Sequence, residues 1–133
     1  MSEFNFKSAI CTSREQSERL LGLGLKKETA DMHHSYYTRV SFDGSKSHFW
    51  KEETGYNEKA IPAWSLHRLI EIADTAYLEE GRRDDDNELW FCMDRCYCWN
   101  NHESFYATNL YDSLINCIKW LIKEGYFNKE YLE

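Results

Sequence analysis

The feature that most constrains the fold is an apolar stripe at helical spacing in the C-terminal part of the sequence. The stripe recurs at steps of three and four residues and consists of Tyr111, Leu114, Ile115, Ile118, Leu121 and Ile122. Asn109 fits an N-cap before it, and Gly125 is expected to end the helix. Leu110 and Trp120 widen the apolar face. So wide a face needs a second layer to cover it, which predicts a packed globular domain.

A second helix is expected near the N-terminus, from about residue 13 to residue 23. Two pairs have the spacing of a capping box, Thr12 with Glu15 and Ser13 with Gln16. Gly24 is expected in the left-handed conformation that ends the helix, with the next leucine folding back onto Leu20.

A third helix is expected in the middle of the chain, starting at Pro62-Ala63-Trp64-Ser65 with Ser65 as its cap. Its apolar stripe is Leu66, Leu69, Ile70, Ala73 and Tyr77. An acidic loop over residues 79–88 is expected to follow it.

The remaining segments predict short strands. Residues 4–11 alternate in a way that suits a strand, and residues 36–42 are rich in strand formers before the turn signal Asp43-Gly44. Residues 47–52 are expected to pair back, so the region up to Gly55 is interpreted as a hairpin or an irregular excursion.

Three strands are expected after the acidic loop, at residues 89–93, 96–99 and 105–108, with a turn at residues 100–104. Together the patterns predict one α+β domain over residues 1–133, with about three helices packed on a small, mainly antiparallel sheet.

Composition and charge exclude several classes. The 21 aromatic residues supply enough apolar area to rule out disorder, and no apolar run is long enough to span a membrane. The net charge is −7, and its excess lies after Ala60. Because Lys and Arg form no cluster, direct nucleic-acid binding is disfavoured. The acidic run at residues 79–88 is either a solvated loop or a surface for a basic protein partner.

The five cysteines are an odd number, and the N-terminus has no basic and apolar signal segment. These observations predict a reduced, cytoplasmic protein in which Cys11 and Cys117 behave as small hydrophobic residues. No cofactor is expected.

Two groups of residues have side chains that suit metal or acid–base chemistry. The first is Cys92, Cys96, Cys98 and His102, which a hairpin alone would bring together around zinc; the alternative is three small apolar residues on a strand with His102 in a turn. The second is the pair His33-His34 near Asp31, with His48 and His67 elsewhere, for which the alternative is solvated or core histidines.

The other groups of residues in the sequence do not match a known metal or catalytic motif. An EF-hand loop counted from Asp84 would need glycine where Leu89 stands, so calcium binding is rejected. The catalytic residues therefore stay unknown, and no metal ligand set is predicted. The aromatic residues either fill the core or form a partner-binding face. These are Trp50, Trp64, Trp90, Trp99, Trp120, Tyr36, Tyr37, Tyr97 and Tyr106.

Three blocks of the sequence are similar to a small uncharacterised family from prophages and mobile elements of gut Bacteroidales. They are residues 12–32 (Thr12 to Leu25, then Thr29-Ala30-Asp31-Met32), Ile61-Pro62-Ala63-Trp64-Ser65-Leu66 and Asn109-Leu110-Tyr111-Asp112. The resemblance implies an intracellular protein encoded by a mobile element, with no catalytic residue to carry over. Asp31 and Ala63-Trp64-Ser65 lie outside the helix stripes, which makes them candidates for a functional surface.

The sequence thus favours a small accessory protein that binds another protein and is not an enzyme. A small metal-binding protein or enzyme that uses His33, His34 and His102 or the cysteines is the alternative. A structural subunit that forms a homo-oligomer through an aromatic interface is a third possibility.

Overall fold

The computed structural model describes residues 8–74, 89–92, 96–99, 103–106 and 109–133. The main elements are α1 (Arg14–Gly22), β1 (Met32–Val40), β2 (Lys46–Thr54), β3 (Ile61–Ala63), α2 (Leu66–Asp74), β4 (Leu89–Cys92), β5 (Cys96–Trp99), β6 (Glu103–Tyr106) and α3 (Leu110–Glu124). Short 3-10 helices lie at Lys27–Thr29 and Lys129–Tyr131. The predicted α+β class with three helices and antiparallel strands is confirmed.

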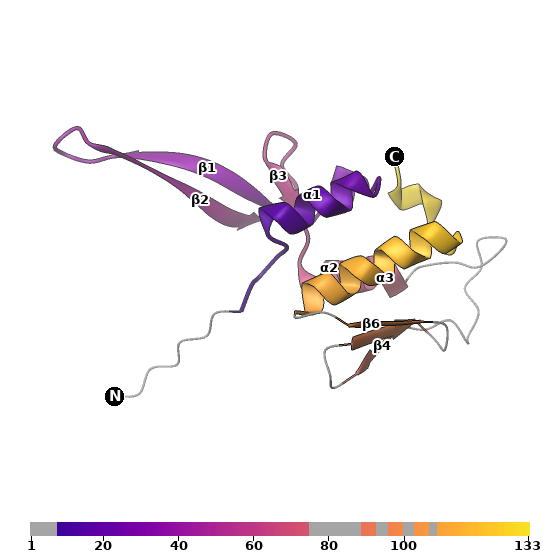
Figure 1. Ribbon diagram of the computed structural model, residues 1–133. Coiled ribbons are helices and arrows are strands. Elements are labelled where there is room, and N and C mark those ends of the chain that lie inside the picture. Colours follow the sequence, from indigo (N-terminus) through magenta and orange to yellow (C-terminus); the bar gives the residue numbers. More distant parts are fainter. Residues whose placement is uncertain (1–7, 75–88, 93–95, 100–102, 107–108) are drawn as a thin grey trace, which may run out of the picture.

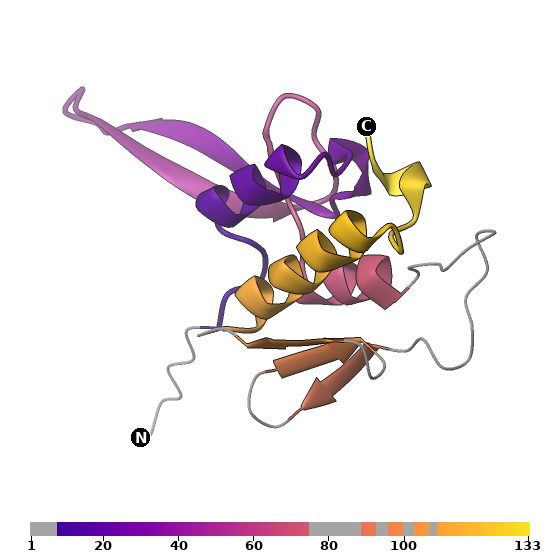
Figure 2. The same cartoon turned by 45° about the vertical axis from the view of Figure 1, so that its right-hand side comes forward.

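The elements form three layers (Figures 1 and 2). Helices α2 and α3 lie side by side in the middle layer, against the antiparallel sheet β4-β5-β6. Helix α1 and the antiparallel sheet β2-β1-β3 lie on the other side of these helices. The strands therefore build two small sheets on opposite sides of the helices.

The helix ends follow the predicted signals. At the start of α1 the Gln16 amide donates to the Ser13 hydroxyl, and the Gln16 side chain accepts from the Ser13 amide. The second of the two predicted capping boxes is therefore the one that forms. At the end of this helix Gly24 has a φ of 95°, and the Leu25 amide donates to the Leu20 carbonyl. Asn109 caps α3, and Gly125 ends it in the left-handed conformation.

The main core lies between the helices. It joins the apolar faces of α1, α2 and α3 with Trp64, Leu25 and Phe127, and its members are between 0% and 9% exposed. The amphipathic C-terminal helix is thus covered as its stripe predicts. In the part of the chain that the structure describes, no helix is both long and apolar enough to cross a membrane.

Several predicted boundaries are wrong. Ser8–Cys11 is not a strand, because this segment runs to a backbone hydrogen bond between Thr12 and Trp64 and joins no ladder; residues 4–7 lie outside the description. Pro62 does not start a helix. It lies in β3, which pairs with only one neighbour, a place where proline's missing N–H is tolerated.

The strand boundaries also shift. Strand β1 starts four residues before the predicted Tyr36 and therefore includes both His33 and His34. Strand β6 starts at Glu103, within the predicted turn, and ends at Tyr106. The predicted positions Tyr77, Met93 and His102, with the acidic run at residues 79–88, lie outside the described residues.

Candidate functional site

Residues 36–51 form a projecting hairpin, which we call the arm. It comprises the outer parts of β1 and β2 and the turn between them, and it extends away from every helix (Figure 1). Strand β1 is buried at its first three residues and exposed from Tyr36 onward. At the turn Phe42 is fully exposed. Large aromatic side chains are thus held in solvent on a regular two-stranded scaffold.

One face of the arm carries a stack of rings. The rings of Tyr36 and His48 lie parallel with centroids 5.7 Å apart, and Trp50 packs against Tyr36 at 5.0 Å. The guanidinium of Arg14, from α1, lies 4.3 Å from the centre of the Trp50 ring. This contact ties the inner end of the stack to the first helix, while Trp50 remains 39% exposed.

The opposite face repeats the pattern. Tyr37 stacks on its cross-strand neighbour Phe49 with centroids 5.7 Å apart, and Arg39 lies over the Phe49 ring. The Tyr37 hydroxyl donates to the Glu53 carboxylate, which raises the pKa of Tyr37 and lowers that of Glu53. Both faces of the arm are therefore aromatic, whereas a strand with one buried face presents a polar outer side.

The edges and the charge of the arm are also unusual for this chain. Strand β2 is the edge of its sheet, and β3 pairs only with the first three residues of β1. Within the described residues the outer arm therefore has two unpaired strand edges. It carries three basic residues, Arg39, Lys46 and Lys51, against the single acid Asp43, whereas the rest of the chain has 13 basic and 22 acidic residues.

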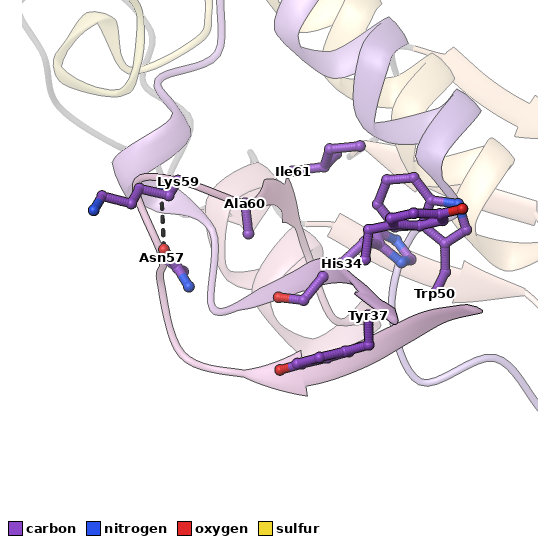
Figure 3. A pocket seen from close by; sticks show the side chains of 9 residues that line it. His34, Tyr37, Trp50, Asn57, Lys59, Ala60 and Ile61 are labelled. Carbon is purple, nitrogen blue, oxygen red and sulfur yellow. Dashed lines mark hydrogen bonds between the residues drawn. The ribbon is translucent and has the colours of Figure 1, made fainter. Parts of the chain in front are cut away.

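A cavity of about 380 Å³ lies at the root of the arm. His34 and Trp50 lie together on one side of it, and Asn57 and Lys59 lie on the other (Figure 3). The Lys59 amide donates to the Asn57 side chain at 2.9 Å, which fixes the far wall.

His34 belongs to a compact group at this root, which we call the root cluster: Cys11, His34 and Glu52. One potential ligand atom from each residue lies within 4.8 Å of the other two. Cys11 comes from the segment before α1, while His34 and Glu52 are directly paired across β1 and β2. Cys11 is 2% and His34 4% exposed, whereas Glu52 is exposed.

Within the root cluster, His34 makes close polar contacts and the ionisation of the Cys11 thiol is shifted. The Nε2–H of His34 donates to the Thr12 carbonyl at 2.8 Å, and the same nitrogen lies 4.0 Å from the Cys11 sulfur. Burial, with the charge of the Glu52 carboxylate and a hydrogen bond to it, raises the pKa of the Cys11 thiol to about 12. The thiol is therefore neutral at neutral pH, which argues against a cysteine nucleophile here.

The root cluster is reached through a second cavity, of about 710 Å³. Cys11 and Glu52 line it, together with Gln16 and the first residues of α3. The pKa of Tyr111, which also lines this cavity, is raised, mainly by burial.

The other histidines that the structure describes do not join this group. The His33 side chain is on the opposite face of β1, where its Nδ1–H donates to the Gly55 carbonyl at 2.8 Å. His48 is on the exposed arm and bonds to Thr38, and His67 is exposed in the first turn of α2. Asp31, which the sequence places close to these histidines, bonds to Ser65.

The predicted cysteine group is only partly described. Strands β4 and β5 pair Cys92 with Cys96 at one end of the sheet, whereas Cys98 lies two residues farther along β5, opposite Trp90. His102 lies outside the described residues, so the zinc alternative and the packing alternative for this group both stay open.

The residues singled out by the family resemblance build the core. Ala63 and Trp64 are fully buried, and the Trp64 indole N–H donates to the Thr29 hydroxyl at 2.9 Å. The carboxylate of Asp31 accepts the N–H and O–H of Ser65 at 2.8 and 2.5 Å, and Ser65 in turn caps α2. These residues are therefore not a functional surface, because they fix where α2 begins.

The sequence reasoning identified His34 and missed Cys11 and Glu52 as its neighbours. Cys11 precedes His34 by 23 residues and Glu52 follows it by 18, so no local motif joins them. The hairpin register is the signal that relates them, because a turn at Asp43-Gly44 places His34 opposite Glu52.

Comparisons with known proteins identify no relative. No protein-family model matches the chain, and neither a curated protein nor a solved structure shows significant similarity to it. The function is therefore argued from the arm and the root cluster alone.

Proposed function

We propose that this chain is a small, non-enzymatic accessory protein that acts by protein–protein binding, with the arm as its binding element and a second copy of the chain as the first partner of the arm. The observation that carries the proposal is the arm itself: two aromatic faces and two unpaired strand edges project from an otherwise well-covered body.

The arm has the residue types and the strand edges that are typical of a protein–protein interface. Tyr, Trp and Arg are the residues that most often dominate binding energy, and the arm presents all three types in Tyr36, Tyr37, Trp50 and Arg39. A two-stranded hairpin is marginally stable alone in water, and adding strands to its edge stabilises it. Pairing with another strand would satisfy the free backbone groups of β2 and shield its rings.

The order of charges along β2 favours a second copy. The strand begins with Lys46 and His48 and ends with Glu52 and Glu53. Antiparallel pairing of two copies about Phe49 places Lys46 opposite Glu52 of the other copy. Pairing about Trp50 places His48 opposite the same glutamate. Either two-fold arrangement sets unlike groups across from each other and brings aromatic rings together at the centre.

In this arrangement two basic arms face each other, so the complementarity comes from Glu52 at the inner end of β2, which lies opposite Lys46 or His48 of the other copy. The cytoplasmic setting and the mobile-element origin remain predictions of the sequence.

Sedimentation velocity of the purified chain over a range of concentrations tests the proposal. We expect a concentration-dependent dimer, whose dissociation constant rises about tenfold in the Phe49→Ala/Trp50→Ala variant. Phe42→Ala is the matched control, because this side chain is more exposed than either ring but lies in the turn, and it should leave the dimer unchanged.

Three outcomes would overturn the proposal. One is a chain that stays monomeric at every concentration, and another is a dimer that the double variant does not weaken. The third is binding of the arm to a labelled single-stranded DNA, measured by fluorescence anisotropy and lost in the same variant. Circular dichroism confirms that each variant retains the fold.

A further inference from the structure

The root cluster combines the three kinds of side chain that bind zinc: a thiol, an imidazole and a carboxylate. Their ligand atoms converge from three segments, the chain before α1, strand β1 and strand β2, and two of the three side chains are almost completely buried. Buried polar groups in contact with each other are uncommon without a reason in packing or in ligand binding. We propose that Cys11, His34 and Glu52 form a binding site for a divalent zinc-like ion at the root of the arm.

The distances are close to those of a zinc site. Zinc bonds of about 2.3 Å to sulfur and about 2.1 Å to nitrogen or oxygen place neighbouring tetrahedral ligands roughly 3.5 Å apart. The Cys11 sulfur and His34 Nε2 are 4.0 Å apart, and all three ligand atoms lie within 4.8 Å of each other. To reach bonding distance, the His34 ring has to turn from the Thr12 carbonyl toward the Cys11 sulfur and the Glu52 carboxylate.

The donor set selects the ion. A thiolate with an imidazole favours zinc and related late transition metals over magnesium or calcium, which prefer oxygen alone. Three protein ligands leave a fourth position for water, as in zinc sites that stay open. The cavity of about 710 Å³ that Cys11 and Glu52 line provides space for that water and a route for the ion.

Binding of the ion changes the protonation of the ligands. The Cys11 thiol releases its proton to solvent and forms the sulfur–metal bond as thiolate. His34 binds as the neutral imidazole: its ring turns so that the hydrogen bond from Nε2 to the Thr12 carbonyl breaks, the ring hydrogen moves to Nδ1, and the lone pair of Nε2 forms the bond to the metal. Glu52 binds as carboxylate. One proton is released for each ion bound, and no oxidant or reductant is needed.

Such an ion would join the arm to the body. Cys11 immediately precedes the N-terminal segment of α1, while His34 and Glu52 lie where β1 and β2 leave the core. The metal would hold the base of the arm against the helices, in addition to the contact between Arg14 and Trp50.

Titration of chelator-treated protein with Co²⁺ tests the site, because a cobalt–thiolate bond has a charge-transfer absorption in the near ultraviolet. The Cys92→Ser/Cys96→Ser/Cys98→Ser variant is used as the starting protein, so that these three thiols do not contribute. We expect one equivalent of Co²⁺ to give the band and one equivalent of Zn²⁺ to remove it.

Two further substitutions on this background locate the site. Cys11→Ser should abolish the band, and Glu52→Gln should weaken Co²⁺ binding at least about tenfold. Glu53→Gln is the matched control, since it makes the same change one residue along β2 but on the other face, near His33 and Tyr37. It should bind Co²⁺ as the starting protein does.

The proposal is overturned if the starting protein shows no band, if the band survives Cys11→Ser, or if Glu52→Gln and Glu53→Gln bind Co²⁺ equally. Glu52 is exposed, so its variant is expected to fold even if loss of the buried thiol is destabilising. The titration runs on the Phe49→Ala/Trp50→Ala background as well, which separates metal binding from self-association.

Discussion

The arm and the body use the same residue types for opposite purposes. In the body Trp64 is fully buried and its indole nitrogen is satisfied by Thr29. On the arm Trp50 is 39% exposed, and its ring contacts Tyr36 and the guanidinium of Arg14. The change takes place within one strand, since β1 is buried up to His34 and exposed beyond Ser35.

This difference shows that burial depends on how many layers cover an element. Among the described strands, the inner part of β1 pairs with both β2 and β3, whereas its outer part pairs with β2 alone. An aromatic residue stabilises the body by filling a covered space. The same residue on an uncovered ribbon is available to a partner.

The largest expected difference between the body and the arm is the loss of unfolding free energy when Trp64 or Trp50 is replaced with alanine. Trp64→Ala leaves a large cavity and an unsatisfied Thr29 contact, so we expect a loss of about 3–5 kcal/mol in the free energy of unfolding. Trp50→Ala should lose less than about 1 kcal/mol, because its ring is already hydrated. Urea unfolding at low protein concentration measures both. Equal losses would show that the arm folds as part of the core.

Asp31 and Asp43 allow a second, smaller comparison, because each accepts an N–H and an O–H from one serine. Asp31 holds Ser65 at 2.8 and 2.5 Å in the partly buried start of α2. Asp43 holds Ser45 at 2.9 and 2.6 Å in the exposed turn of the arm. We expect Asp31→Ala to cost about 2 kcal/mol, since it leaves the start of α2 without its partner.

Asp43→Ala should leave the global free energy of unfolding unchanged within error, because solvent replaces the lost contacts. Urea unfolding of the two variants side by side decides this point. A large loss for Asp43→Ala, or none for Asp31→Ala, contradicts the assignment of the two regions.

The helices were predictable because their signals are local. Ser13, Asn109 and Gly125 act within one turn of the helices they bound, and the stripe of α3 is complete in the sequence. The segment around Pro62 was not predictable in the same way. Its residues become a strand because β1 begins at Met32 and pairs with them, a contact between segments about 30 residues apart.

The candidate site was predictable only in part, for the same reason. His34 stands out as a residue type, but its neighbours follow from the register of the hairpin and from the path of the chain before α1. The sequence left open whether Tyr36 and Trp50 fill the core or form a partner-binding face, because the choice depends on which layers cover the hairpin. Residue type therefore indicated which side chains could bind a metal or a partner, whereas their neighbours and exposure followed from the tertiary structure.

The smallest expected effect concerns the pH dependence of the arm turn. Hydrogen bonds from the hydroxyl and the amide of Ser45 hold the pKa of Asp43 below its usual 3.8. Because the folded pKa lies below the unfolded one, the contribution of Asp43 to turn order is complete above pH 3.8. It is lost as the pH falls through the lower, folded value.

We expect the amide signal of Ser45 in NMR spectra to titrate with a midpoint below 3.8, with the core signals of Leu114 and Ile118 unmoved over the same step. In Asp43→Asn the Ser45 step should disappear, because the amide cannot titrate. A midpoint at or above 3.8 would show that the turn does not hold the carboxylate. A step shared with the core would instead show that the arm and the body unfold together, so that the distinction between a covered body and an uncovered arm fails.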